Sequence, residues 1–135
     1  MTLIVDASVA VKWVLLEPDR DSALALIGSE TLAAPEFLRV EFAQVMAREA
    51  RRDAISPADA ARGLAIFDRA RVRLEPSSPL LDEAFAMALV LKASVYDSLY
   101  LALAVREHAQ LVTADEKFGK AALSHPSYAG SVRLL

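Results

Sequence analysis

Four acidic residues stand where carboxylates often serve chemistry. Asp6 ends the run TLIVD and Asp115 ends LVTAD, and both runs are short, apolar and typical of β-strands. Asp97 opens the long apolar segment DSLYLALAVREH, which predicts a buried helix, and Glu41 lies between apolar residues of another helical pattern. Each acid alone has an ordinary explanation as a turn residue, a helix cap or a solvated charge. Together, however, the four acids predict a functional site.

Converging carboxylates require a compensating charge. Two like charges about 5 Å apart at an effective dielectric near 20 repel by roughly 3 kcal/mol, which favours protonation or a bound cation. The chain has no cysteine, and its two histidines show no metal-ligand spacing. Oxygen ligands alone favour Mg²⁺ or Mn²⁺, which can activate water and bind substrate phosphates. We therefore expect phosphodiester chemistry, with Asp6, Glu41, Asp97 and Asp115 as catalytic and metal-binding residues.

Hydroxyl groups lie near three of these acids in the sequence. Ser8 and Thr113 are each two positions from a strand-end acid, and Ser98 follows Asp97. They can hydrogen-bond a carboxylate or a metal-bound water, although turns and caps use the same residue types. We interpret all three as candidate supporting residues.

Basic side chains are unevenly distributed. The net charge is −3, yet residues 39–73 contain eight arginines and five acids, a net of +3. Within this span Gln44, Arg48 and Arg52 follow Glu41 at helical spacing, which would align them on one face. A solvated face with local ion pairs is the favoured interpretation of such a stripe, and a nucleic-acid contact is the alternative. Lys12 and Lys117 are further candidate phosphate contacts.

Strand and helix patterns alternate along the chain. We expect strands at TLIVD, TLAAP, VRLEP, QLVT and SVRLL, and helices at 7–17, 20–27, 36–52, 57–71, 80–92 and 97–108. A helical turn and loop should join the last two strands. This alternation is typical of a parallel sheet covered by helices on both faces, with ligands bound beyond the carboxyl ends of the strands. The strand-end acids would lie at that edge.

Length and composition limit the remaining possibilities. At 135 residues the chain fits one domain spanning 1–135, and a hydrophobic content of 55% predicts a subunit interface. No apolar run approaches the roughly 20 residues of a membrane span, and no signal-peptide pattern opens the sequence. We therefore expect a cytoplasmic protein with no membrane partner.

The motifs together resemble the PIN-domain family. The segments VDASVAVKW, the glutamate following AP-EFLRV, SVYDSLYLALA and LVTADEKF are similar in order and spacing to the four acidic motifs of VapC-type toxin ribonucleases. The resemblance implies a three-layer α/β/α fold with a central parallel sheet of about five strands, Mg²⁺- or Mn²⁺-dependent RNA cleavage, a homodimer and a cognate VapB-type antitoxin. Gln44 departs from the asparagine that the family often carries there.

Other interpretations remain open. A phosphoacceptor receiver domain also has a doubly wound sheet, but it normally carries adjacent acids after its first strand. A haloacid dehalogenase-type phosphohydrolase would need a second aspartate at position 8, which is serine. The remaining alternative is a non-catalytic PIN-like binding module. The presence of all four acids counts against it.

Overall fold

The computed structural model describes every residue from Met1 to Leu135 and is built on a five-stranded parallel sheet. The strands lie in the order β3-β2-β1-β4-β5. Leu3 of β1 is paired with Leu32 of β2 on one side and with Gln110 of β4 on the other. Their bounds are β1 (Thr2–Val5), β2 (Thr31–Pro35), β3 (Arg73–Glu75), β4 (Gln110–Thr113) and β5 (Val132–Leu134). All five strands lie within the predicted segments.

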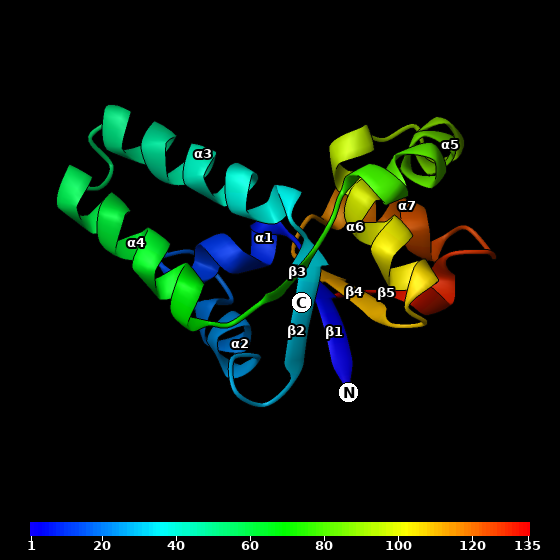
Figure 1. The fold of residues 1–135 in the computed structure, drawn as a ribbon, viewed down its shortest axis with the longest axis horizontal. Helices are drawn as coiled ribbons and strands as arrows, with labels where there is room; N and C mark the ends of the chain where they lie inside the picture. The colour runs from blue at the N-terminus through cyan, green and yellow to red at the C-terminus, as the bar shows by residue number, and fades with distance from the viewer.

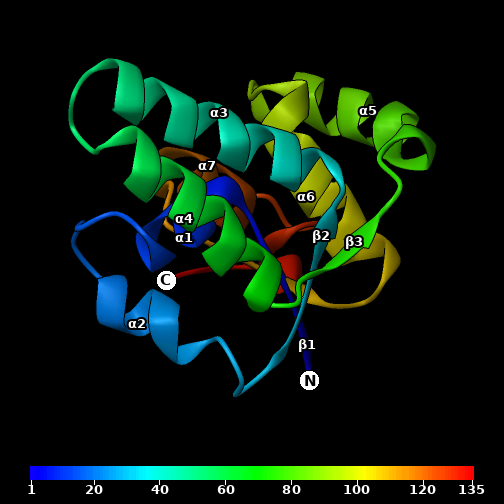
Figure 2. The same ribbon diagram turned by 60° about the vertical axis from the view of Figure 1, so that its left-hand side comes forward.

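Helices cover both faces of this sheet. One group joins β1 to β2 and β2 to β3, and the other joins β3 to β4 and β4 to β5. Right-handed crossovers that run in opposite directions from β1 place the two groups on opposite faces, as Figures 1 and 2 show. The first group is α1 (Ala7–Ala10), α2 (Arg20–Ala25), α3 (Phe37–Arg51) and α4 (Pro57–Arg69); the second is α5 (Leu81–Leu91), α6 (Val95–Arg106) and α7 (Glu116–Leu123). The three-layer α/β/α prediction is confirmed.

Helix α6 is the central helix of the core. Seven consecutive residues, Ser98–Ala104, are buried because α6 packs against β1, β2 and β4 and against α5. Such complete burial explains why its sequence is apolar on every side.

No single helix is long and apolar enough to cross a membrane. Only the bent pair Ser78–Leu91 and Val95–Arg106, with 114° between its arms, meets the length and composition requirement.

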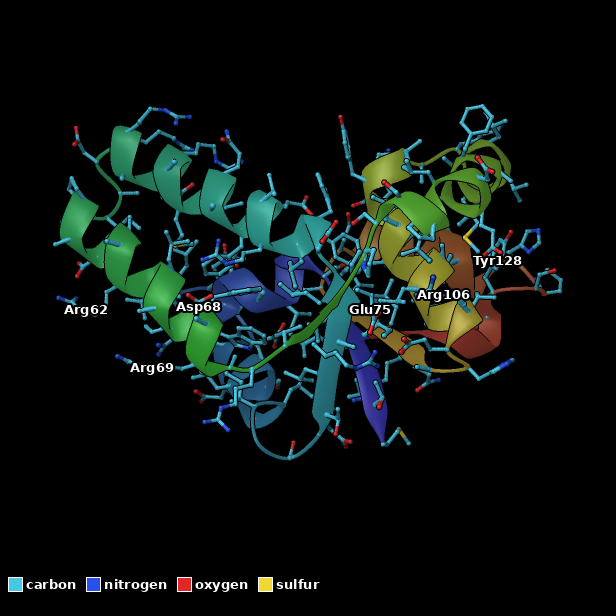
Figure 3. The ribbon with its side chains drawn as sticks, viewed as in Figure 1. Arg62, Asp68, Arg69, Glu75, Arg106 and Tyr128 are labelled. Atoms are coloured by element: carbon cyan, nitrogen blue, oxygen red, sulfur yellow. The ribbon has the colours of Figure 1, made fainter.

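Helices α3 and α4 form a hairpin that extends beyond the sheet (Figure 1). Ser56 caps α4 by accepting a hydrogen bond from the Asp59 amide at 3.0 Å, and the helix begins at residue 57, as the sequence predicts. The rings of Phe42 and Phe67 pack between the two helices with centroids 4.9 Å apart. Figure 3 shows Arg62 on the side of α4 that faces away from the sheet. The hairpin is therefore apolar inside and charged outside.

Several helix boundaries differ from the predictions. The helix expected over residues 7–17 is a four-residue α-helix followed by a 3₁₀ turn at Val11–Trp13, because β-branched residues are poor helix formers and the Trp13 indole donates to the Ala23 carbonyl. Helix α5 ends at Leu91, and Lys92 follows in the left-handed conformation with φ 53°. His108, expected in the last turn of α6, also has φ 53° and lies beyond the end of that helix at Arg106.

Candidate active site

The four acids lie beyond the carboxyl ends of the strands. Asp6 follows β1, Asp115 follows β4 by two residues, Glu41 is in the second turn of α3, and Asp97 is in the first turn of α6. Figure 1 shows that α3 and α6 begin close together above this edge of the sheet. Because β1 and β4 are the neighbours at which the chain reverses its crossover direction, this is the edge where a doubly wound sheet binds ligands.

Asp6 is buried and held by hydroxyl groups. Ser8 Oγ donates to Asp6 Oδ1 and Thr113 Oγ1 donates to Asp6 Oδ2, each at 2.5 Å. The Val9 amide adds a longer bond of 3.3 Å, so Asp6 also caps α1. Burial raises the pKa of Asp6 to about 6, the hydrogen bonds oppose this rise, and the charge of Asp97 adds to it. A cation beside Asp6 would favour the ionised form.

Ser8 and Thr113 also fix the backbone beyond β4. Ser8 Oγ accepts a hydrogen bond from the Ala114 amide at 2.8 Å, and Thr113 Oγ1 accepts one from the Asp115 amide at 3.1 Å. Each hydroxyl therefore donates to Asp6 and accepts from the chain that carries Asp115. The two residues therefore link Asp6 to the backbone that carries Asp115.

Glu41 is held by a residue that sequence reasoning missed. Tyr100 of α6 is 1% exposed, and its hydroxyl donates to Glu41 Oε1 at 2.5 Å. Burial raises the pKa of Glu41, the Tyr100 bond opposes the rise, and the charge of Asp97 adds to it. A phenol within an otherwise aliphatic buried helix needs a polar partner, so Tyr100 could have been singled out from the sequence.

Asp97 is not the cap of α6. Ser94 is the cap, accepting a hydrogen bond from the Asp97 amide at 3.0 Å. Burial raises the pKa of Asp97, a hydrogen bond with the Ser94 side chain opposes the rise, and the charge of Asp115 adds to it. Asp97 in turn raises the pKa of Asp6 and Glu41, so it is the centre of the mutual repulsion. Capping therefore does not explain a carboxylate at this position.

Asp115 has a structural role as well as its place in the cluster. Its Oδ1 accepts a hydrogen bond from the Phe118 amide at 3.0 Å, which caps α7. Ser98, expected beside a carboxylate, is fully buried and donates to the Ser94 carbonyl at 2.8 Å instead. Ser98 therefore stabilises the first turn of α6 and supports Asp97 only indirectly.

The predicted basic contacts divide into paired and unpaired groups. Lys12 is buried, and its Nζ donates to the Pro18 carbonyl at 2.8 Å and to Glu17 at 3.4 Å. Arg48 and Arg52 both bind Glu49, at 3.4 and 3.7 Å. These contacts match the favoured interpretation of the helical stripe, which is a solvated face with ion pairs. Gln44 of the stripe is exposed, and Lys117 has no ion pair.

The donor set suits a hard cation that keeps its own waters. No three carboxylates or imidazoles lie close enough to enclose a metal ion by themselves. Mg²⁺ usually binds one or two carboxylates, several waters and substrate phosphates rather than a cage of protein ligands. Repelling, partly buried carboxylates around Asp97 fit that mode of binding.

Comparisons with known proteins agree with this geometry. Residues 3–123 match the family model of the PIN domain. The chain is 34% identical over 113 residues to the VapC ribonuclease Mb0985 of Mycobacterium bovis and to ribonuclease VapC9 of Mycobacterium tuberculosis, covering 84% of this chain and 85% of each relative.

Two solved structures share the fold. PAE2754 from Pyrobaculum aerophilum superposes with a TM-score of 0.73 at 23% identity, over 98% of this chain and 83% of that one. VapBC2 from Rickettsia felis, bound to a DNA fragment from its promoter, superposes with a TM-score of 0.69 at 17% identity, over 100% of this chain and 99% of that one. Together with the family model and the mycobacterial relatives, they establish that this chain belongs to the PIN-domain family, among its VapC ribonucleases.

Proposed function

We propose that this protein is a metal-dependent endoribonuclease and the toxin of a toxin–antitoxin pair. The observation that carries the proposal is Asp97, a partly buried carboxylate whose charge acts on Asp6 and Glu41 and which is itself repelled by Asp115. The VapC ribonucleases that share 34% identity with the chain supply the reaction class.

Each site residue has a role in this proposal. Asp6, Glu41, Asp97 and Asp115 would hold Mg²⁺ or Mn²⁺ together with the waters that the ion keeps, since no three of these acids lie close enough to enclose it by themselves. Such an ion lowers the pKa of a bound water and neutralises charge on the phosphate during hydrolysis. Ser8 and Thr113 orient Asp6, and Tyr100 orients Glu41, so the carboxylates need little rearrangement when substrate binds.

A VapB-type antitoxin is the proposed protein partner. A structural neighbour at 17% identity is described as VapBC2, which supports the same kind of assembly here. The acidic site and the pockets beside it are the surfaces that an antitoxin would cover to block RNA. An RNA substrate would place this activity in the cytoplasm.

A homodimer would cover the exposed apolar side chains of α3, α5 and α6. Val40, Phe85, Leu89 and Tyr96 are 59–66% exposed, and Tyr96 stacks on Phe37 with centroids 5.2 Å apart. Apolar side chains gathered in this way are typical of subunit interfaces. Light scattering should give twice the 14.6 kDa mass of the chain, and the mass of one chain would contradict the dimer.

Cleavage of RNA tests the proposal directly. Purified protein free of antitoxin should cut mixed cellular RNA with Mg²⁺ or Mn²⁺, and chelator should stop the reaction. Asp97→Asn should lower the rate at least about 100-fold, because it removes the charge at the centre of the cluster. Asp82→Asn, which makes the same change at an exposed position in the first turn of α5, is the matched control.

Two results would contradict the proposal. A folded, metal-loaded protein that cuts no RNA would favour the non-catalytic binding module. Full cleavage by Asp97→Asn would show that the cluster is not the active site.

A further inference from the structure

Helix α3, which carries Glu41, has no cap of its own. The preceding residue, Glu36, is in the helical conformation, and its side chain bonds none of the first amide groups. Helices α1, α4, α6 and α7 are each capped by the side chain directly before them. Because the first amides of a helix have no partner within it, those of α3 need one from another part of the chain.

The segment after β3 supplies those partners. Ser77 Oγ, 40 residues later in the sequence, accepts a hydrogen bond from the Phe37 amide at 3.1 Å. The Glu75 carbonyl accepts one from the Glu36 amide at 2.6 Å. Pro35 and Glu75 are paired where β2 and β3 end, so the two connections leave the sheet side by side (Figures 1 and 2). Ser77 therefore caps α3 from the neighbouring connection.

Ser77 also links α3 to α6. Its hydroxyl does not cap the 3₁₀ turn Ser78–Leu80 that follows it, but its carbonyl accepts a hydrogen bond from the Leu80 amide at 2.9 Å. Leu80 is 1% exposed, and the turn packs against α5 and α6. Ser77 is therefore bonded both to α3 and to a turn that lies on the helix carrying Asp97 and Tyr100.

The relative position of α3 and α6 matters because a hydrogen bond at Glu41 joins them. Glu41 lies one turn after Phe37 on the same face of α3, and its Oε1 accepts a hydrogen bond from the Tyr100 hydroxyl at 2.5 Å. Hydrogen bonds between two oxygen atoms span only about 2.5–3.0 Å. A shift in the first turn of α3 would therefore weaken the bond that holds Glu41.

We propose that Ser77 is a positioning residue of the active site, which fixes the first turn of α3 so that Glu41 meets Tyr100. Its hydroxyl bonds to the Phe37 amide, so Ser77 acts through the helix rather than on the reacting groups. This inference rests on the proposed ribonuclease function, and it extends the site to a residue outside the acidic cluster and its hydroxyl partners.

The first measurement compares two serine caps. Ser77→Ala and Ser56→Ala each remove a hydroxyl that accepts from a helix amide, at 3.1 and 3.0 Å. Loss of one cap should leave the domain folded, which urea unfolding checks. Ser77→Ala should lower kcat about five- to tenfold with KM nearly unchanged, because a misplaced carboxylate slows the chemical step. Ser56→Ala should change neither, since α4 carries none of the four acids.

Ser77→Thr is the conservative variant. Threonine keeps a hydroxyl that can cap α3, so kcat should stay within about twofold of the wild-type value. A loss of activity caused only by lower stability would instead follow the urea midpoint, and Ser56→Ala would show it as well.

A second readout needs neither metal nor RNA. Urea unfolding of Ser77→Ala, Tyr100→Phe and the double variant, in chelator at pH 7.5, forms a double-mutant cycle. If Ser77 acts through the bond between Tyr100 and Glu41, the double variant should lose less stability than the two single variants together. The same cycle with Ser56→Ala in place of Ser77→Ala should be additive.

Two results would overturn the inference: a wild-type kcat in Ser77→Ala, or an additive cycle between Ser77 and Tyr100. If either occurs while Asp97→Asn still lowers cleavage, the ribonuclease proposal stands and only the role of Ser77 fails. If the folded, metal-loaded wild-type protein cuts no RNA, the ribonuclease proposal fails, and the active-site role of Ser77 fails with it.

Discussion

The two sides of the carboxylate cluster are built differently. On the Asp6 and Glu41 side, hydroxyl groups hold the acids, and glutamates neutralise the nearby cations. On the Asp97 and Asp115 side, the two carboxylates repel each other, and two exposed lysines, Lys92 and Lys117, have no acidic partner. The first side is preorganised and electrically balanced, whereas the second leaves charge available to a ligand. A site with both properties can position a metal ion on one side and substrate on the other.

The largest expected effect is on the pH dependence of the free energy of unfolding, when the charge of Asp6 on the preorganised side is removed. Burial raises the pKa of Asp6 from 3.8 to about 6, so the folded protein binds a proton more tightly than the unfolded chain. Without metal, the stability that this proton contributes is present below pH 4 and is lost as the pH rises through about 6. The loss is about 3 kcal/mol, at 1.36 kcal/mol per pKa unit.

Asp6→Asn should abolish that part of the pH dependence. Urea unfolding in chelator at pH 4.5 and 7.5 measures it, with Asp82→Asn as the control. The wild-type protein should lose more stability than the Asn variant between these pH values, and Mg²⁺ should restore stability only to the wild type. Identical pH dependence in both proteins would show that Asp6 is not buried as the structure describes.

A smaller effect is expected from the hydrogen bond that holds Glu41 on the preorganised side. Tyr100→Phe removes the hydroxyl that donates to Glu41 but keeps the buried ring. The free energy of unfolding should fall by about 1.5–3 kcal/mol at pH 7.5, the usual contribution of a hydrogen bond to a charged group. Cleavage should slow about tenfold, because Glu41 loses its fixed orientation.

Tyr96→Phe, which removes a hydroxyl from a 60% exposed ring, is the control for Tyr100→Phe. A Tyr100→Phe protein with wild-type stability and rate would mean that Glu41 does not depend on this bond.

The smallest effect should come from making the paired cations available. Glu49→Gln releases Arg48 and Arg52 from their shared carboxylate. RNA affinity in the Asp6→Asn background should rise about two- to fivefold, with a steeper salt dependence, because phosphates gain two contacts. The control is Glu116→Gln, which makes the same charge change beside Lys120. If both variants bind alike, local pairing does not explain the difference between the sides.

Sequence patterns predicted the elements better than the contacts between them. Alternation placed all five strands, and Ser56-Pro57 marked the start of α4, because these signals are local. The same patterns brought all four acids to one edge of the sheet. The bond from Tyr100 to Glu41 depends on how two separate helices pack, which spacing along the chain does not encode.

Local and tertiary contacts that the sequence patterns do not reveal changed the ends of two helices. The helix after Asp6 breaks into a 3₁₀ turn because Trp13 bonds to the carbonyl of Ala23, ten residues away. A helix cap was the ordinary alternative for Asp97, but Ser94, three residues earlier, takes that role. Capping therefore does not compete with the functional interpretation of Asp97.

The pairing of β1 with β4 has a consequence during synthesis on the ribosome. Thr113, which holds Asp6, and Asp115 are made more than a hundred residues after Asp6. Parallel strands so distant in sequence cannot pair until the later one has left the ribosome. A nascent chain that still lacks β4 therefore lacks a complete site, and a cell that makes this protein would meet its activity only after β4 and Asp115 have been translated.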